Sequence, residues 1–172
     1  MSILKVSRLG HPVLRQQSRP VSPEVLATSA IQTLIDNMIE TMVEYFGVGL
    51  AAPQVHESLS IAVIESRGPR GEIPLTVLVN PVMTVLDESL VEDWEGCLSI
   101  PDLRGRVPRF NRLRLDALDR HGKRIEFQAE GFFARVVQHE LDHLMGHVYV
   151  DRMRGFTTLT HFAEFQKYWL QQ

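Results

Sequence analysis

The feature that most constrains this sequence is a His-Glu-x-x-His pattern within Gln138–His143. In a helix of about 3.6 residues per turn, His139 and His143 lie one above the other on the same face. Two imidazoles placed in this way can bind one metal ion, and Glu140 beside them can accept a proton from water that the metal activates. Because such short patterns also recur by chance, the prediction of a metal site depends on finding a third ligand elsewhere in the chain.

The residues on either side of this pattern are typical of a helix. Apolar residues recur at helical spacing before and after the histidines, among them Phe132, Val136 and Leu141. Gly131 stands at the expected start, and Gly146 stands where a left-handed C-terminal cap is expected. We therefore predict that both histidines belong to one helix.

Length and composition are those of a single soluble globular domain over residues 1–172. A chain of 172 residues can bury a substantial core, and 44% hydrophobic with 23% charged residues is an ordinary balance. The net charge of -3 gives neither a basic footprint for nucleic acid nor a polybasic membrane patch. These values exclude no class of soluble enzyme.

Nothing in the sequence predicts a membrane span or a targeting segment. No run approaches the ~20 apolar residues of a membrane helix, and the N-terminus lacks the apolar stretch of a signal peptide. The one cysteine, Cys97, excludes an intrachain disulfide and suits a reducing compartment. We expect a cytoplasmic protein; a bacterial protein and a processed organellar one are not separated by these features.

Residue spacing predicts an α+β fold with mostly antiparallel sheets. Apolar residues recur every three or four positions from Ile31 to Phe46, which indicates a long amphipathic helix. Further elements are indicated as strands at residues 59–64, 75–85, 112–118 and 125–129, and as a shorter helix at residues 156–170. Strands precede the histidine helix instead of alternating with helices, which favours α+β over repeated βαβ units.

Two residues are candidates for the third metal ligand. Glu164 lies on the predicted terminal helix, where a metallopeptidase with this histidine pattern can place a carboxylate, and this alternative predicts a zinc endopeptidase. Cys97 is favoured over it, because a metal-bound thiolate is a strong soft ligand that needs no disulfide partner. The residue types alone leave both alternatives open.

Two further short segments, Gly47–Gln54 and Glu95–Ser99, indicate the class of enzyme. Gly47–Gln54 consists of small residues and one amide, Gln54, and it is no phosphate loop because no Lys-Ser/Thr pair follows. The second segment, Glu95–Ser99, surrounds the lone cysteine. In chain order, these segments and Gln138–His143 resemble the three motifs of peptide deformylases. The likeness extends to Gly10–Arg15 and so covers nearly the whole chain.

This resemblance implies an α+β fold whose antiparallel sheets surround a central helix that carries the histidines. It implies a hydrolase that removes the N-formyl group from the N-terminal formyl-methionine of newly synthesised proteins and releases formate. The implied metal ligands are Cys97, His139 and His143, with water in the fourth position. The implied cofactor is one divalent ion, usually Fe²⁺, with Zn²⁺, Ni²⁺ or Co²⁺ as substitutes among which the sequence does not choose.

The resemblance also implies three catalytic groups outside the ligand set. Glu140 would accept a proton from the water and deliver it to the leaving amine. The side-chain amide of Gln54 and the backbone N–H of Leu98 would donate to the oxyanion that forms on the formyl oxygen.

An extended N-formyl-methionyl peptide is expected to lie beside the first two motifs. The matching substrate-binding positions are Val48, Gly49, Gly96, Arg104, Phe132 and Val136. Arg135 departs from the family's pattern, because many relatives carry an apolar residue at this position. Its effect on the pocket for the methionine side chain is therefore open at this stage.

Two acidic residues next to the expected ligands, Glu95 and Asp142, are expected to form ion pairs. Glu95 is expected to pair with Arg104 or Arg109, and Asp142 with an arginine that the sequence does not identify. The implied partners are N-formyl-methionyl peptides and nascent chains near the ribosome. We expect a monomer without contacts to nucleic acid or membrane.

Overall fold

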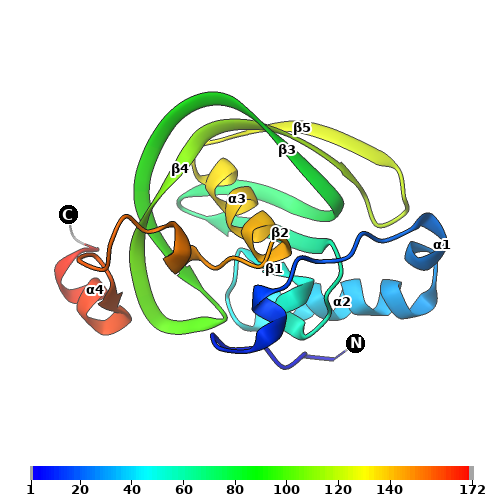
Figure 1. Cartoon of the computed structure of the whole chain (residues 1–172), viewed down its shortest axis with the longest axis horizontal. Coiled ribbons are helices and arrows are strands. Elements are labelled where there is room, and N and C mark those ends of the chain that lie inside the picture. The colour runs from blue at the N-terminus through cyan, green and yellow to red at the C-terminus, as the bar shows by residue number, and fades with distance from the viewer. Residues whose placement is uncertain (1, 171–172) are drawn as a thin grey trace.

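A six-stranded sheet curves around the helix that carries the histidines in the computed structural model, which describes residues 2–170 (Figure 1). The strands run in the order β1-β2-β3-β4-β5 with antiparallel neighbours, and β6 pairs with β4. They are β1 (Gly49–Ala51), β2 (Ile61–Gly68), β3 (Gly71–Cys97), β4 (Ile100–Leu118), β5 (Arg124–Glu130) and β6 (Thr160–His161). The helices are α1 (Pro23–Leu26), α2 (Ser29–Glu44), α3 (Phe132–Leu144) and α4 (Phe162–Tyr168), with 3-10 turns η1 (Pro12–Arg15), η2 (Ala52–Val55) and η3 (Tyr149–Arg152). The predicted α+β class is confirmed.

Strand β2 lies between two helices, which explains its unbroken apolar start. Side chains alternate across a strand, so Ile61 and Val63 face the core beneath α2, while Ala62 and Ile64 face the core around α3. A strand buried on both faces reads as a continuous apolar run instead of an alternating one. The α2 side chains in the first core are Ile31, Ile35, Met38 and Met42.

Helix α3 is buried on nearly all sides, as a central helix must be. It contacts each of the strands β1 to β5, and Figure 1 shows it in the middle of the curved sheet. The predicted ends are confirmed: Gly131 (φ +58°) precedes the helix, and Gly146 (φ +78°) follows it. Gly146 is also required sterically, because a Cβ there would lie 2.8 Å from the carbonyl carbon of Arg15.

The β3–β4 hairpin is much longer than predicted. The predicted strands at residues 75–85 and 112–118 are only the inner parts of β3 and β4, and the acidic segment 87–95 continues β3. Register shifts interrupt the pairing at Val85/Asp87 and Asp87/Leu90, and such bulges bend a strand. The outer part of the hairpin bends back toward α3 (Figure 1). Cys97 is the last residue of β3, at the end of this part of the hairpin.

The predicted terminal helix at residues 156–170 is wrong in its first half. Helix α4 begins only at Phe162, after an N-cap at His161 whose side chain accepts from the Ala163 N–H. The residues before it include Thr160, which pairs with Arg104 as part of the short strand β6. β-Branched threonines suit a strand better than a helix, which accounts for the later start. Among the described helices, none combines the length and the apolar character needed to cross a membrane.

Candidate metal centre

Three side chains from two distant parts of the chain converge at one point. His139 and His143 come from α3, and Cys97 comes from the end of β3. Their ligand atoms all lie within 4.8 Å of one another, and Cys97 Sγ is 3.2 Å from His143 Nε2. Glu164, the alternative third ligand, is exposed on α4 and does not belong to this group.

The turn between β3 and β4 fixes the thiol of Cys97. Cys97 pairs with Ile100 across the tight turn, and the Ser99 backbone N–H donates to Sγ at 3.4 Å. Burial by itself raises the pKa of the Cys97 thiol, but the charge of His143 and hydrogen bonds from both histidines bring this pKa well below its usual value. The site therefore favours a thiolate, which is the form that binds metals.

Glu95 orients the first histidine. Its Oε2 lies 2.9 Å from His139 Nδ1, so this ring nitrogen carries the proton and Nε2 is left for a metal. Burial opposes the charge on Glu95, but hydrogen bonds from His139 and Arg109 hold the pKa of this carboxyl well below its ordinary range. A metal-ligating histidine typically has a carboxylate partner of this kind, so the arrangement fits a metal centre.

Glu140 is enclosed beside the ligands. It is 3% exposed, and its Oε2 has no hydrogen-bond partner within the described part of the chain. A Cβ at Gly49 would lie 2.2 Å from Glu140 Oε1, so only glycine leaves room for this carboxyl. Burial raises the pKa of Glu140 to about 7, against the lowering effect of the two histidines. A carboxyl with a pKa near neutrality suits both acceptance and return of a proton.

This shift of the Glu140 pKa predicts a pH dependence of the metal-free protein. Folding raises the pKa from 4.5 to about 7, so the folded state holds an extra proton between these pH values. The contribution of Glu140 to the free energy of unfolding should therefore fall by about 3 kcal/mol as pH rises from below 4.5 to above 7. Urea denaturation at a series of pH values should show that the Glu140→Gln variant does not lose this contribution. A difference in the free energy of unfolding between wild type and variant that does not vary with pH would contradict the prediction.

Gln54 faces the same point from η2. Its Oε1 accepts from the Ala51 backbone N–H at 2.8 Å, which turns the amide nitrogen Nε2 toward Cys97 Sγ at 3.4 Å and Ser99 Oγ at 3.3 Å. Gln54 is 1% exposed but lines the cavity. The amide is thus held as a hydrogen-bond donor next to the three ligand atoms.

A cavity of about 690 Å³ opens over this centre. All six predicted substrate-binding residues line it, and so do Gln54, Leu98 and Glu140. Sequence reasoning missed several aromatic side chains of this wall: Tyr45, Phe46 and Phe162. The positive φ of Phe46 (+55°) is unusual for a bulky residue, but no sequence pattern signals it.

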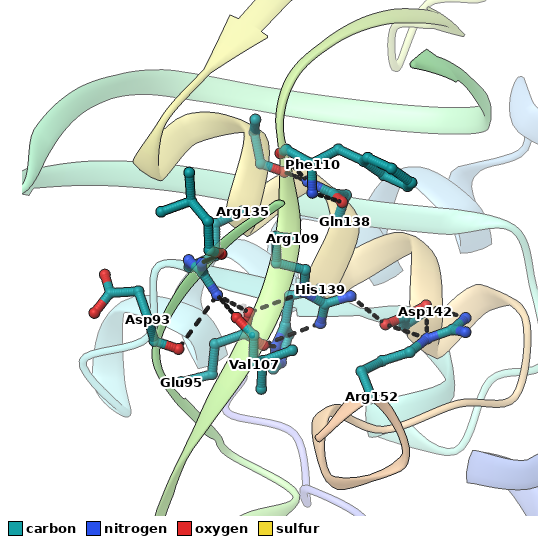
Figure 2. A network of polar contacts seen from close by, with 12 residues as sticks. Asp93, Glu95, Val107, Arg109, Phe110, Arg135, Gln138, His139, Asp142 and Arg152 are labelled. Atoms are coloured by element: carbon teal, nitrogen blue, oxygen red, sulfur yellow. Dashed lines mark hydrogen bonds and ion pairs between the residues drawn. The ribbon is translucent and has the colours of Figure 1, made fainter. Parts of the chain in front are cut away.

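A buried charge network lies behind the ligands (Figure 2). Glu95 pairs with Arg109, one of the two expected partners, at 2.9 and 3.0 Å. The other, Arg104, instead stacks on the Phe162 ring at 4.4 Å. Asp142 pairs with Arg109 at 2.6 Å and with Arg152 at 2.7 Å, which identifies the arginines that the sequence left open.

The polypeptide deformylase family model matches residues 3–158 of this chain. The chain belongs to this family. It is similar to peptide deformylase 1 of Bordetella pertussis, with 45% identity over 157 residues that cover 88% of each chain. As a member of the peptide deformylase family, the protein is an enzyme that removes the N-formyl group from nascent proteins.

Solved deformylase structures have the same fold. The Met-Ala-Ser-bound class I type b peptide deformylase of Acinetobacter baumannii has a TM-score of 0.84 and 38% identity, and covers 88% of this chain and 98% of that one. The peptide deformylase of Thermotoga maritima has a TM-score of 0.81 and 34% identity, with 89% and 99% covered. The converging thiol and imidazoles of this chain form a metal site that suits the divalent ion of a deformylase.

Proposed function

We propose that Cys97, His139 and His143 hold one divalent metal ion, with Fe²⁺ as the native ion and Zn²⁺, Ni²⁺ or Co²⁺ as substitutes. The observation that supports this most directly is the convergence of one thiol and two imidazoles within 4.8 Å. Mixed sulfur and nitrogen ligands suit these borderline ions better than Mg²⁺ or Ca²⁺, which prefer oxygen. Three protein ligands also leave a coordination position open for catalysis.

In the proposed mechanism, the side chains around the ligands move one proton and stabilise one charge. The bound metal ion supplies Lewis acidity, which lowers the pKa of a water molecule. Glu140 would accept a proton of this water as the water oxygen bonds to the formyl carbon, and would return the proton to the nitrogen that leaves when the formyl C–N bond breaks. Gln54 and the Leu98 backbone N–H donate to the oxygen that becomes negative. The products are formate and a free amine.

Gln54→Ala tests the proposed oxyanion contact. We expect kcat/KM to fall by about 10²–10³-fold, because one preorganised donor to the developing charge is lost. The metal content should stay unchanged, because the amide is not a ligand. Loss of metal in parallel with activity would instead make Gln54 a support for Cys97 Sγ, 3.4 Å away.

The proposed substrates are N-formyl-methionyl peptides that bind in an extended form. The related Acinetobacter enzyme has been crystallised with Met-Ala-Ser, a peptide that begins with methionine. We infer that Val48, Phe132 and Val136 contact the methionine side chain, because they line the cavity next to the ligands. The missing side chain of Gly96 leaves room for the guanidinium of Arg104, because a Cβ on Gly96 would be 2.3 Å from this group. Gly49 is the remaining backbone position proposed to face the peptide.

We further infer that residues 1–172 form a single domain and that the protein acts as a cytoplasmic monomer on nascent chains close to the ribosome. The sharing of β2 between both main cores supports one domain. The net charge of -3 does not favour direct contact with RNA.

The proposed function is tested by a formate-release assay on formyl-Met-Ala-Ser. The protein is purified without oxygen, because a ferrous thiolate site is sensitive to oxidation, and metal is measured on the same sample. We expect one formate per peptide and one metal ion per chain. Cleavage of an internal peptide bond without release of formate would overturn the proposal.

A further inference from the structure

Arg135 is a buried cation that the proposed mechanism does not use. It lies on α3 one turn before His139, and its side chain is only 6% exposed. Both positions therefore point to the same side of the helix. Burying a guanidinium is costly unless its donors are satisfied, so its contacts show what the position requires.

The guanidinium of Arg135 joins α3 to the outer parts of both hairpin strands. It donates to the Val91 carbonyl at 2.6 Å and the Asp93 carbonyl at 3.4 Å on β3, and to the Val107 carbonyl at 2.8 Å on β4. Strand β2 pairs with β3 only as far as Val79, so the stretch of β3 around Val91 has no second neighbouring strand among the described residues. Arg135 therefore satisfies carbonyls that would otherwise need another partner.

The same guanidinium also reaches the carboxylate that orients His139. Glu95 Oε1 accepts from Arg135 at 2.8 Å and from Arg109 at 2.9 Å, while Oε2 accepts from Arg109 at 3.0 Å and contacts His139 Nδ1 at 2.9 Å (Figure 2). All four lone-pair directions of this carboxylate are thus occupied, which fixes its plane. The plane of the carboxylate in turn sets the tilt of the His139 ring.

We propose that Arg135 is a positioning residue that couples the wall of the substrate cavity to the metal ligand His139. Arg135 itself lines the cavity, and its guanidinium contacts both the β3 backbone, at Val91 and Asp93, and the Glu95 carboxylate. Arg109 also contacts Glu95, but its other partner is Asp142, and it is not among the described residues that line the cavity. Arg135 thus links the substrate cavity to the geometry of the ligand His139.

This inference rests on the proposed metal site, so the wild-type protein is tested first. The Co²⁺-loaded enzyme should show thiolate-to-metal absorption and release formate; failure of either result overturns the proposed function rather than the role of Arg135. The variant Arg135→Met then removes the donors while keeping an unbranched side chain. The control is Arg114→Met, which removes an exposed arginine on β4 that pairs with Asp116 at 3.2 Å.

For Arg135→Met we expect Co²⁺ to be lost to a chelator about 10–100-fold faster, since partners behind a metal ligand typically have effects of this size. The visible absorption bands of bound Co²⁺ should shift, and KM for formyl-Met-Ala-Ser should rise more than kcat falls. Combining Arg135→Met with Glu95→Gln should add little to the Glu95→Gln effect, because Arg135 acts through this carboxylate. Arg114→Met should match the wild type in every readout.

A folded Arg135→Met protein with wild-type metal release, absorption and KM would overturn the proposal, whatever its thermal stability. If the methionine variant does not fold, Arg135→Lys carries the test. Lysine keeps the positive charge but lacks the planar guanidinium with its several N–H donors. It therefore cannot donate to the Val91 carbonyl and to Glu95 at the same time. We expect faster metal release than in the wild type; a folded lysine variant with wild-type release and KM would overturn the proposal equally.

Discussion

Replacing Cys97 with alanine is expected to abolish retention of tightly bound metal. Only His139 and His143 would remain as ligands, and two imidazoles on one helix leave the coordination sphere too open to hold a borderline ion through purification. The thiolate is favoured at this buried site by the charge of His143, so its contribution to affinity should be large. Metal per chain, measured after desalting, should fall from about one to near zero, and formate release should fall with it.

The matched control for this experiment is Glu164→Gln, which removes the alternative third ligand. Glu164 is exposed on α4 and lies outside the ligand group, so this variant should keep its metal and its activity. The opposite pattern, with metal kept in Cys97→Ala and lost in Glu164→Gln, would contradict the ligand assignment and favour the endopeptidase alternative. Circular dichroism on both variants separates metal loss from unfolding.

The ligand residues were predictable because each has a local sequence signal. Helical periodicity places His139 and His143 on one face, and the lone Cys97 stands out because no disulfide partner exists. Choosing between Cys97 and Glu164 from residue types alone was not possible. That choice depends on the bend of the β3–β4 hairpin, which is a property of long-range pairing and bulges.

The charge network behind the ligands was predictable only in part. Arg104 and Arg109 were equally plausible partners of Glu95, since both follow it on the chain within the same hairpin. The register of β3 against β4 pairs Val91 with Arg109 and Glu95 with Gly105, so Glu95 and Arg109 lie on the same face of the hairpin. Arg104 lies on the Phe162 ring of α4 instead. The contact of Arg135 with Glu95 joins a helix to a strand far away in sequence, so no pattern in either segment predicts it.

The outer part of β3 was not predictable from the sequence for a different reason. The acidic segment 87–95 lacks the apolar alternation of a half-buried strand, because its side chains are largely exposed on the outer part of the hairpin. Its strand conformation comes from pairing with β4, as at Val91↔Arg109. Pairing of this kind is tertiary information, whereas β2 was predictable from its own apolar residues.

Glu140→Gln is expected to leave the metal in place and to remove nearly all turnover. Glutamine has almost the same shape, and Glu140 lies beside the ligand group without belonging to it. What is lost is a group that accepts a proton and returns it, and general acid–base catalysis of this kind contributes about 10²–10⁴-fold. We therefore expect kcat to fall by that factor, while KM and metal content change little.

The structure makes this loss specific to position 140. Gly49 leaves room for the Glu140 carboxyl, and burial raises the pKa of this carboxyl to about 7. A pKa near neutrality allows the carboxyl both to accept a proton and to release it. An exposed glutamate on β5, Glu126, provides the control, and Glu126→Gln should keep full activity. A metal-loaded Glu140→Gln enzyme that keeps kcat within tenfold of wild type would mean that another base accepts the proton. The other carboxylates among the described residues that line the cavity are Glu95 and Asp102. The lone pairs of Glu95 are already engaged by Arg109, Arg135 and His139, and Asp102 is exposed.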